Sequence, residues 1–95
     1  RRITGPELLR MGVETASVAD EELLATALGI ASEIAGKAPL AVRAAKRSFN
    51  VTEDMPLHSG YRFEQSQTVA LAGTQDTQEA QRAFAEKRPP VFTGR

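Results

Sequence analysis

The segment Phe84-Ala85-Glu86-Lys87-Arg88 combines an aromatic ring with two positive charges. If the segment is helical, Phe84, Lys87 and Arg88 are three and four residues apart and share one helical face. An aromatic side chain beside two cations suits a ligand that carries an adenine ring and a phosphate. A structural role suits them equally, because Lys and Arg in a last helical turn complement the helix dipole and Phe is a common core residue. The spacing alone leaves both interpretations open.

The other reactive side chains form no recognisable site. The adjacent acids Glu21-Glu22 and Glu53-Asp54 do not face each other on a helix, and both pairs stand where solvated helix ends are expected. His58 is the only histidine, and no acid or nucleophile pattern surrounds it. The glycines are dispersed, and no glycine-rich phosphate-binding sequence occurs. These residues are expected to be structural.

Composition argues against several classes of protein. Twelve basic residues balance twelve acidic ones, whereas nucleic-acid-binding modules carry a net basic surface. Without cysteine, and with a single histidine, the chain lacks the ligands for a disulfide framework or a Cys- or His-based zinc site. No stretch reaches the roughly 18 consecutive apolar residues of a membrane span. We expect no nucleic-acid partner, no membrane partner and no metal, and an intracellular, cytoplasmic location.

The length of 95 residues allows one domain at most. A domain of this size buries only roughly 60–65% of the surface of its unfolded chain, so its stability is marginal. The chain starts with Arg1 rather than Met, close to a helix entry, and Arg1-Gly5 contains no apolar signal-peptide region. We therefore expect that further sequence precedes Arg1 and that the chain relies on a partner or on the rest of its protein.

Boundary signals and apolar periodicity predict five helices and no sheet. Thr4-Gly5-Pro6-Glu7 has the pattern of a capping box with Pro just inside the helix, and Gly12 is a natural left-handed end. Residues 13–18 are rich in β-branched side chains and are expected to form a brief extended connector. Residues 91–95 are too few for an element and either dock through Phe92 or stay mobile. The predicted helices cover residues 6–11, 20–36, 39–52, 56–72 and 75–87.

Two of these helices differ in their apolar pattern. The helix that starts at Asp20 repeats apolar residues at i, i+3 and i+4 spacing, which predicts an amphipathic helix. The helix over residues 56–72 has a stripe that is polar in the middle, so we expect it to be only partly buried.

Two segments resemble stretches that are characteristic of the crotonase (enoyl-CoA hydratase/isomerase) superfamily. Residues 30–47 resemble the pattern A-x-x-I-A-x-K-x-P-x-A-x-x-x-x-K, and residues 74–94 resemble the ending T-x-D-x-x-E-G-x-x-A-F-x-E-K-R-x-P-x-F-x-G. Residues 1–12 are similar to the helix that follows the family's catalytic core. The resemblance implies an all-α fold for residues 1–95, namely the C-terminal helical domain of a crotonase-type subunit, serving oligomerisation and covering of the CoA site.

The same resemblance implies a function for the parent subunit. That subunit would be an enoyl-CoA hydratase acting on acyl-CoA thioesters in fatty-acid or related metabolism, with the CoA thioester as substrate and no prosthetic group. Its ββα-spiral core would precede Arg1 and supply two oxyanion-hole amides and two catalytic glutamates, which stabilise the enolate and move protons. The chain alone is therefore expected to hold no catalytic residue and to be inactive.

The resemblance also implies partners and site residues. In the family this helical domain lies over the acyl-CoA site and contributes contacts within a trimer, often a dimer of trimers. Phe84 and Lys87 match positions near the adenosine-phosphate end of CoA, Lys87 as a charged donor to phosphate oxygens and Phe84 as an apolar wall for the adenine. Arg88 is a weaker candidate for the same CoA-binding site.

Three positions depart from the family's pattern. Thr68 falls where some hydratases have an aromatic residue near the adenosine, Ala80 replaces a Gly, and Glu14 stands where an aliphatic residue is usual. Since residues outside this chain choose the reaction, a crotonase-type isomerase, dehalogenase or decarboxylase is an alternative. A stand-alone helical interaction module without catalysis or CoA affinity is another.

Overall fold

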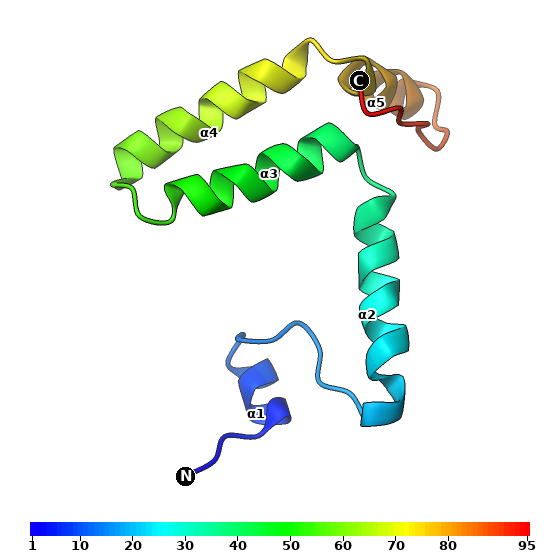
Figure 1. Ribbon diagram of the computed structural model, residues 1–95. Helices are drawn as coiled ribbons and strands as arrows, with labels where there is room; N and C mark the ends of the chain where they lie inside the picture. The colour runs from blue at the N-terminus through cyan, green and yellow to red at the C-terminus, as the bar shows by residue number, and fades with distance from the viewer. The chain divides into compact units, whose positions relative to one another are not determined.

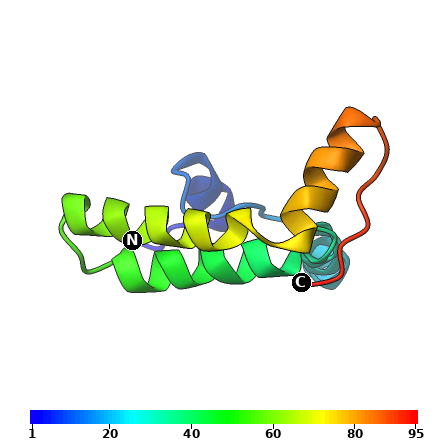
Figure 2. The same cartoon turned by 90° about the horizontal axis from the view of Figure 1, so that it is seen from above.

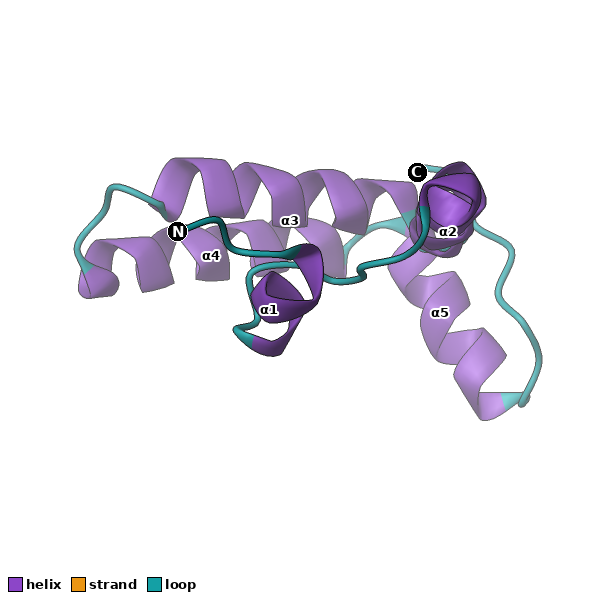
Figure 3. Ribbon diagram, turned by 90° about the horizontal axis from the view of Figure 1, so that it is seen from below, coloured by secondary structure: helices purple, strands orange, loops and turns teal.

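The computed structural model describes all 95 residues and confirms the all-α prediction (Figures 1 and 3). It contains no strand, and the connectors between helices are short. The chain divides into two compact units, Arg1–Ser32 and Glu33–Arg95. The five helices are α1 (Gly5–Arg10), α2 (Asp20–Ala35), α3 (Pro39–Thr52), α4 (Leu57–Ala72) and α5 (Gln75–Ala85).

The first unit begins with the predicted capping box. The Glu7 carboxylate accepts hydrogen bonds from the backbone N–H and the hydroxyl of Thr4, each at 2.9 Å. α1 then ends at Arg10, and Gly12 adopts a left-handed φ of 76°, as its predicted role as a helix end requires. The connector that follows forms no strand. Both boundaries of α1 lie within one residue of the prediction.

α2 forms where the apolar periodicity predicts a helix, and three acids occupy its first turn. None of its residues is buried, and Leu23, Leu24 and Leu28 keep 61%, 70% and 57% of their surface exposed. A helix with an apolar stripe normally buries that stripe against another element. Within this chain the apolar face of α2 therefore has no partner.

α3 and α4 form a helical hairpin in the second unit, lying side by side and running in opposite directions (Figures 1 and 2). The guanidinium carbon of Arg47 lies 5.9 Å from the centre of the Phe63 ring, within the range of a cation–π contact. No residue of α4 is buried, which confirms the prediction of a helix that is only partly covered. The hairpin is therefore an exposed pair of helices with no buried residue of its own.

The buried residues of the chain lie on α5. Ala83 and Asp76 are each 2% exposed, and no other residue is buried. They are covered in part by residues 88–95, here called the C-terminal strap, which runs back along α5 from its end toward its start (Figure 2). Polar bonds of Val91, Thr93 and Gly94 dock the tail on α5, whereas docking through Phe92 stays a prediction.

α5 is shorter than predicted, because it ends at Ala85 and not at Lys87. The Lys87 N–H bonds the Phe84 carbonyl at 3.2 Å and the Arg88 N–H bonds the Ala83 carbonyl at 3.0 Å, which is the Schellman pattern of a helix end. Two prolines follow Arg88 and cannot continue a helix. The predicted common helical face of Phe84, Lys87 and Arg88 is accordingly wrong.

No single helix of the chain is long and apolar enough to cross a membrane. One bent pair, α2 followed by α3, reaches the necessary length and composition when the two helices are taken together.

The start of α5 provides a test of its capping. The Thr74 hydroxyl accepts from the Thr77 N–H at 3.2 Å and donates to the Leu71 carbonyl at 2.8 Å. We expect Thr74→Ala to destabilise α5 by about 1 kcal/mol and Thr74→Ser to be nearly neutral, since only Ser keeps the cap. Amide hydrogen exchange of residues 75–85 in the intact protein measures this, and equal exchange in both variants would contradict it.

Candidate functional site

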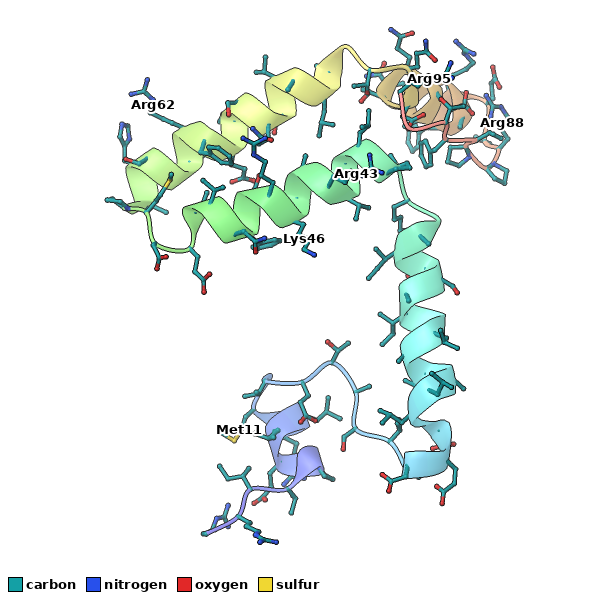
Figure 4. The ribbon with its side chains drawn as sticks, viewed as in Figure 1. Met11, Arg43, Lys46, Arg62, Arg88 and Arg95 are labelled. Atoms are coloured by element: carbon teal, nitrogen blue, oxygen red, sulfur yellow. The ribbon has the colours of Figure 1, made fainter.

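Arg88, which is labelled in Figure 4, forms ion pairs with Glu79 and Glu86 and keeps 36% of its side-chain surface exposed. Its Nη1 and Nη2 donate to the two carboxylate oxygens of Glu79 at 2.6 and 3.1 Å, which is a bidentate ion pair. Its Nε donates to Glu86 at 2.6 Å, and Nη1 also reaches the Pro89 carbonyl at 3.2 Å. These bonds leave a single N–H donor of the guanidinium unused.

The ion pair with Arg88 determines the electrostatic environment of Glu79. Its side chain is 16% exposed, and besides Arg88 it accepts the Val91 N–H at 3.0 Å. The Arg88 guanidinium, and next the Val91 N–H, lower the pKa of Glu79 from 4.5 to about 2. Glu79 in turn raises the pKa of Arg88, with Glu86 adding to the effect. The fold therefore stabilises the charged forms of both Glu79 and Arg88.

Asp76 holds the far end of the strap. Its two carboxylate oxygens accept the N–H groups of Thr93 at 2.7 Å and Gly94 at 2.8 Å. Its own backbone N–H donates to the Arg95 carbonyl at 2.8 Å. Gly94 has a left-handed φ of 76°, which a residue without a Cβ adopts at little cost. The buried carboxylate of Asp76 thus has hydrogen-bond donors, without which its burial would be costly.

Phe84 and Lys87 lie at the open end of α5. The Phe84 ring is 88% exposed, an unusual position for a large aromatic side chain. Lys87 is exposed, takes part in none of the three ion pairs, and has a left-handed φ of 53°. It is the only residue other than glycine with a positive φ. An apolar ring and a free ammonium are therefore presented within one turn of chain.

The structure separates the three predicted site residues into two groups. Phe84 and Lys87 remain neighbours at the helix end, joined by a backbone hydrogen bond, and both are free to meet a ligand. Arg88 faces the carboxylates of Glu79 and Glu86 instead. Sequence reasoning did not find Asp76 and Glu79, because their bonds to the strap join residues 9 to 18 positions apart, beyond the reach of local spacing.

A concave region runs along the α3–α4 hairpin. It is a shallow groove of about 380 Å³, lined mostly by small and apolar side chains, with Phe49, Thr68 and Leu71 among them. The Thr68 hydroxyl donates to the Glu64 carbonyl at 3.3 Å, so this position presents a methyl group and a satisfied hydroxyl. An aromatic wall at this position, as the family pattern has it in some hydratases, is absent.

Comparison with known proteins identifies the family. The family model described as "Enoyl-CoA hydratase/isomerase" matches residues 1–95, which is the whole chain. The chain therefore belongs to the enoyl-CoA hydratase/isomerase family. Similar curated proteins include the carnitinyl-CoA dehydratases of Salmonella typhimurium, 37% identical over 99 residues, and of Salmonella typhi, 36% identical. The alignments cover 100% of this chain but 38% of each relative.

Solved structures of enoyl-CoA hydratases match the whole chain. An enoyl-CoA hydratase from Bacillus anthracis matches with a TM-score of 0.90 and 34% identity, covering 100% of this chain and 37% of the other. An enoyl-CoA hydratase/isomerase from Mycobacterium paratuberculosis matches with a TM-score of 0.91 and 29% identity over the same shares. The five helices are therefore those of an enoyl-CoA hydratase/isomerase, whose own chain is more than twice as long.

The lowered pKa of Glu79 predicts how the strap responds to acid. A carboxylate with a depressed pKa in the folded state adds stability above its unfolded pKa, and this stability is lost as the pH falls toward the folded value. We expect the strap to loosen between pH 4.5 and about 2. The Val91 amide signal in NMR spectra measures this step. In Glu79→Gln the step should vanish, and its persistence there would contradict the assignment.

Proposed function

We propose that this chain is the C-terminal helical part of an enoyl-CoA hydratase-type enzyme and that Phe84 and Lys87 contact the adenosine-phosphate end of coenzyme A. One observation carries the proposal: an almost fully exposed aromatic ring stands beside a lysine that has a constrained backbone and no intramolecular ion pair. Exposed aromatic and charged residues that the fold does not use are typical of binding sites.

Lys87 suits the phosphate of the adenosine-phosphate end of coenzyme A, and Phe84 suits its adenine. An ammonium donates charge-assisted hydrogen bonds to phosphate oxygens, and each is stronger than a bond between neutral groups. The Phe84 ring offers a flat apolar surface on which an adenine can stack. The Arg88 guanidinium has one donor left and so has less to offer a phosphate.

For the whole protein we propose the hydration of enoyl-CoA thioesters, or the reverse dehydration. The support is family membership together with the names of the relatives, which are hydratases and dehydratases. Another crotonase-type reaction, such as an isomerisation, is the alternative, because this chain's residues bind the remote end of the substrate and do not select the chemistry. We propose that the enzyme acts in the cytoplasm.

We further propose that the apolar face of α2 is covered in the assembled protein, by the catalytic core or by another subunit of a trimer or of a dimer of trimers. Leu23, Leu24 and Leu28 are each more than half exposed in the chain alone. Burying the surface that is still exposed would stabilise the assembly by roughly 1–2 kcal/mol for each side chain. The domain would then serve both assembly and covering of the CoA site.

Lys87→Ala tests the site in the protein that the complete gene encodes. We expect KM for an acyl-CoA substrate to rise about tenfold with kcat nearly unchanged, because the lost hydrogen bond is made equally in ground state and transition state. Steady-state kinetics measures the effect. Lys46→Ala, an exposed lysine on α3, is the matched control and should leave KM unchanged. An unchanged KM in Lys87→Ala would refute the assignment.

The reading frame around Arg1 distinguishes an enzyme segment from a stand-alone module. We expect the gene to encode, before Arg1, a core with two glutamates placed for acid–base chemistry. A start codon directly before Arg1, together with a stably folded monomer that does not bind coenzyme A, would favour the interaction module instead. Sequencing the gene and sedimentation of its product decide between the two.

A further inference from the structure

We propose that Glu79 and Arg88 are positioning residues, which hold Lys87 in its left-handed conformation so that a phosphate of coenzyme A meets a charge already in place. This inference rests on the proposed function of Lys87. It assigns Arg88 a role that differs from direct contact with the ligand.

The backbone at Lys87 is the first observation. A left-handed φ brings the Cβ of an L-residue close to the following carbonyl and costs roughly 1–2 kcal/mol, which is why Gly usually stands at this point of a Schellman helix end. Here the position carries Lys with a φ of 53°. Such a conformation persists only where the surroundings determine it, and it is commonest at functional sites.

The neighbours of Lys87 are the second observation. Arg88 bonds Glu86 through Nε at 2.6 Å, so the residues on either side of Lys87 are tied to each other. The same guanidinium bonds Glu79 with both Nη atoms, and Glu79 lies on the preceding turns of α5. Lys87 therefore sits at the tip of a closed loop whose two arms are fixed to the helix, while its own side chain remains free.

The direction of the strap is the third observation. Glu79 also accepts the Val91 N–H at 3.0 Å, so one carboxylate holds both the side chain of Arg88 and the backbone three residues later. The chain must consequently turn away from the helix axis at Lys87. The turn directs the strap along α5 and leaves the end of the helix, with Phe84, uncovered.

A lysine held in this way binds more tightly than the same lysine on a mobile tail. Ordering a flexible segment on binding costs free energy, and a segment that is already ordered avoids much of that cost. Arg88 is poorly suited to bind phosphate itself, because a phosphate would have to displace the bidentate Glu79. Lys87 therefore contacts the ligand, while Glu79 and Arg88 determine where Lys87 lies.

A double-mutant cycle in the complete protein tests this. Glu79→Gln keeps an acceptor for the Val91 N–H but removes the charged bidentate partner of Arg88. We expect it to raise the Kd of coenzyme A, measured by calorimetry, about fivefold, and to raise KM without changing kcat. In a Lys87→Ala background the same change should have less than about a twofold effect, because the residue that it positions is gone. Glu53→Gln, an exposed acid after α3, is the matched control and should have no effect.

Each other outcome has a distinct meaning. If Lys87→Ala leaves the Kd unchanged, the proposed function of Lys87 fails. If Lys87→Ala weakens binding but Glu79→Gln does not, only the positioning role is overturned. An equal effect of Glu79→Gln in both backgrounds also overturns it, because the effect then does not pass through Lys87. Arg88→Lys, which keeps the charge but not the fork geometry, should match Glu79→Gln, and normal affinity in that variant would overturn the proposal if Glu79→Gln proves too unstable to measure.

Discussion

The ion pair between Glu79 and Arg88 is the interaction on which the end of the chain depends. Its two parallel bonds, at 2.6 and 3.1 Å, turn the chain back at the end of α5. The strap that follows is then close enough for its backbone to meet Asp76, and the only two buried residues of the chain lie beneath or beside it. A surface ion pair contributes little by itself, but this one is bidentate and shares its carboxylate with a backbone N–H.

Most helix boundaries followed from the sequence because their signals are local. The capping box at Thr4 and the helix end at Gly12 each act through neighbouring backbone groups, and the structure contains both. The end of α5 could not be predicted in the same way. Pro89 and Pro90 indicate that the helix ends nearby, but local signals give neither its exact end at Ala85 nor the bond between Arg88 and Glu79, nine residues earlier.

The candidate site could also be predicted only where its signals are local. Phe84 and Lys87 were identified by residue type, and the structure leaves both exposed at one helix end. The role of Asp76 could not be predicted from local spacing, because its bonds reach 17 and 18 residues along the chain. Conversely, the apolar pattern of α2 correctly predicted a helix, but a pattern cannot say whether the element that covers it belongs to the same chain.

The short reach of the strap's bonds has a consequence for the order of folding. The contacts that hold it join residues 9 to 18 positions apart, so closing these loops costs little chain entropy. Contacts of this kind form early and without help from distant parts of a protein. The apolar side chains Leu23, Leu24 and Leu28 of α2, by contrast, are exposed and make no comparable local contacts. The strap and the end of α5 are thus expected to form before any contacts that join more distant parts of the sequence.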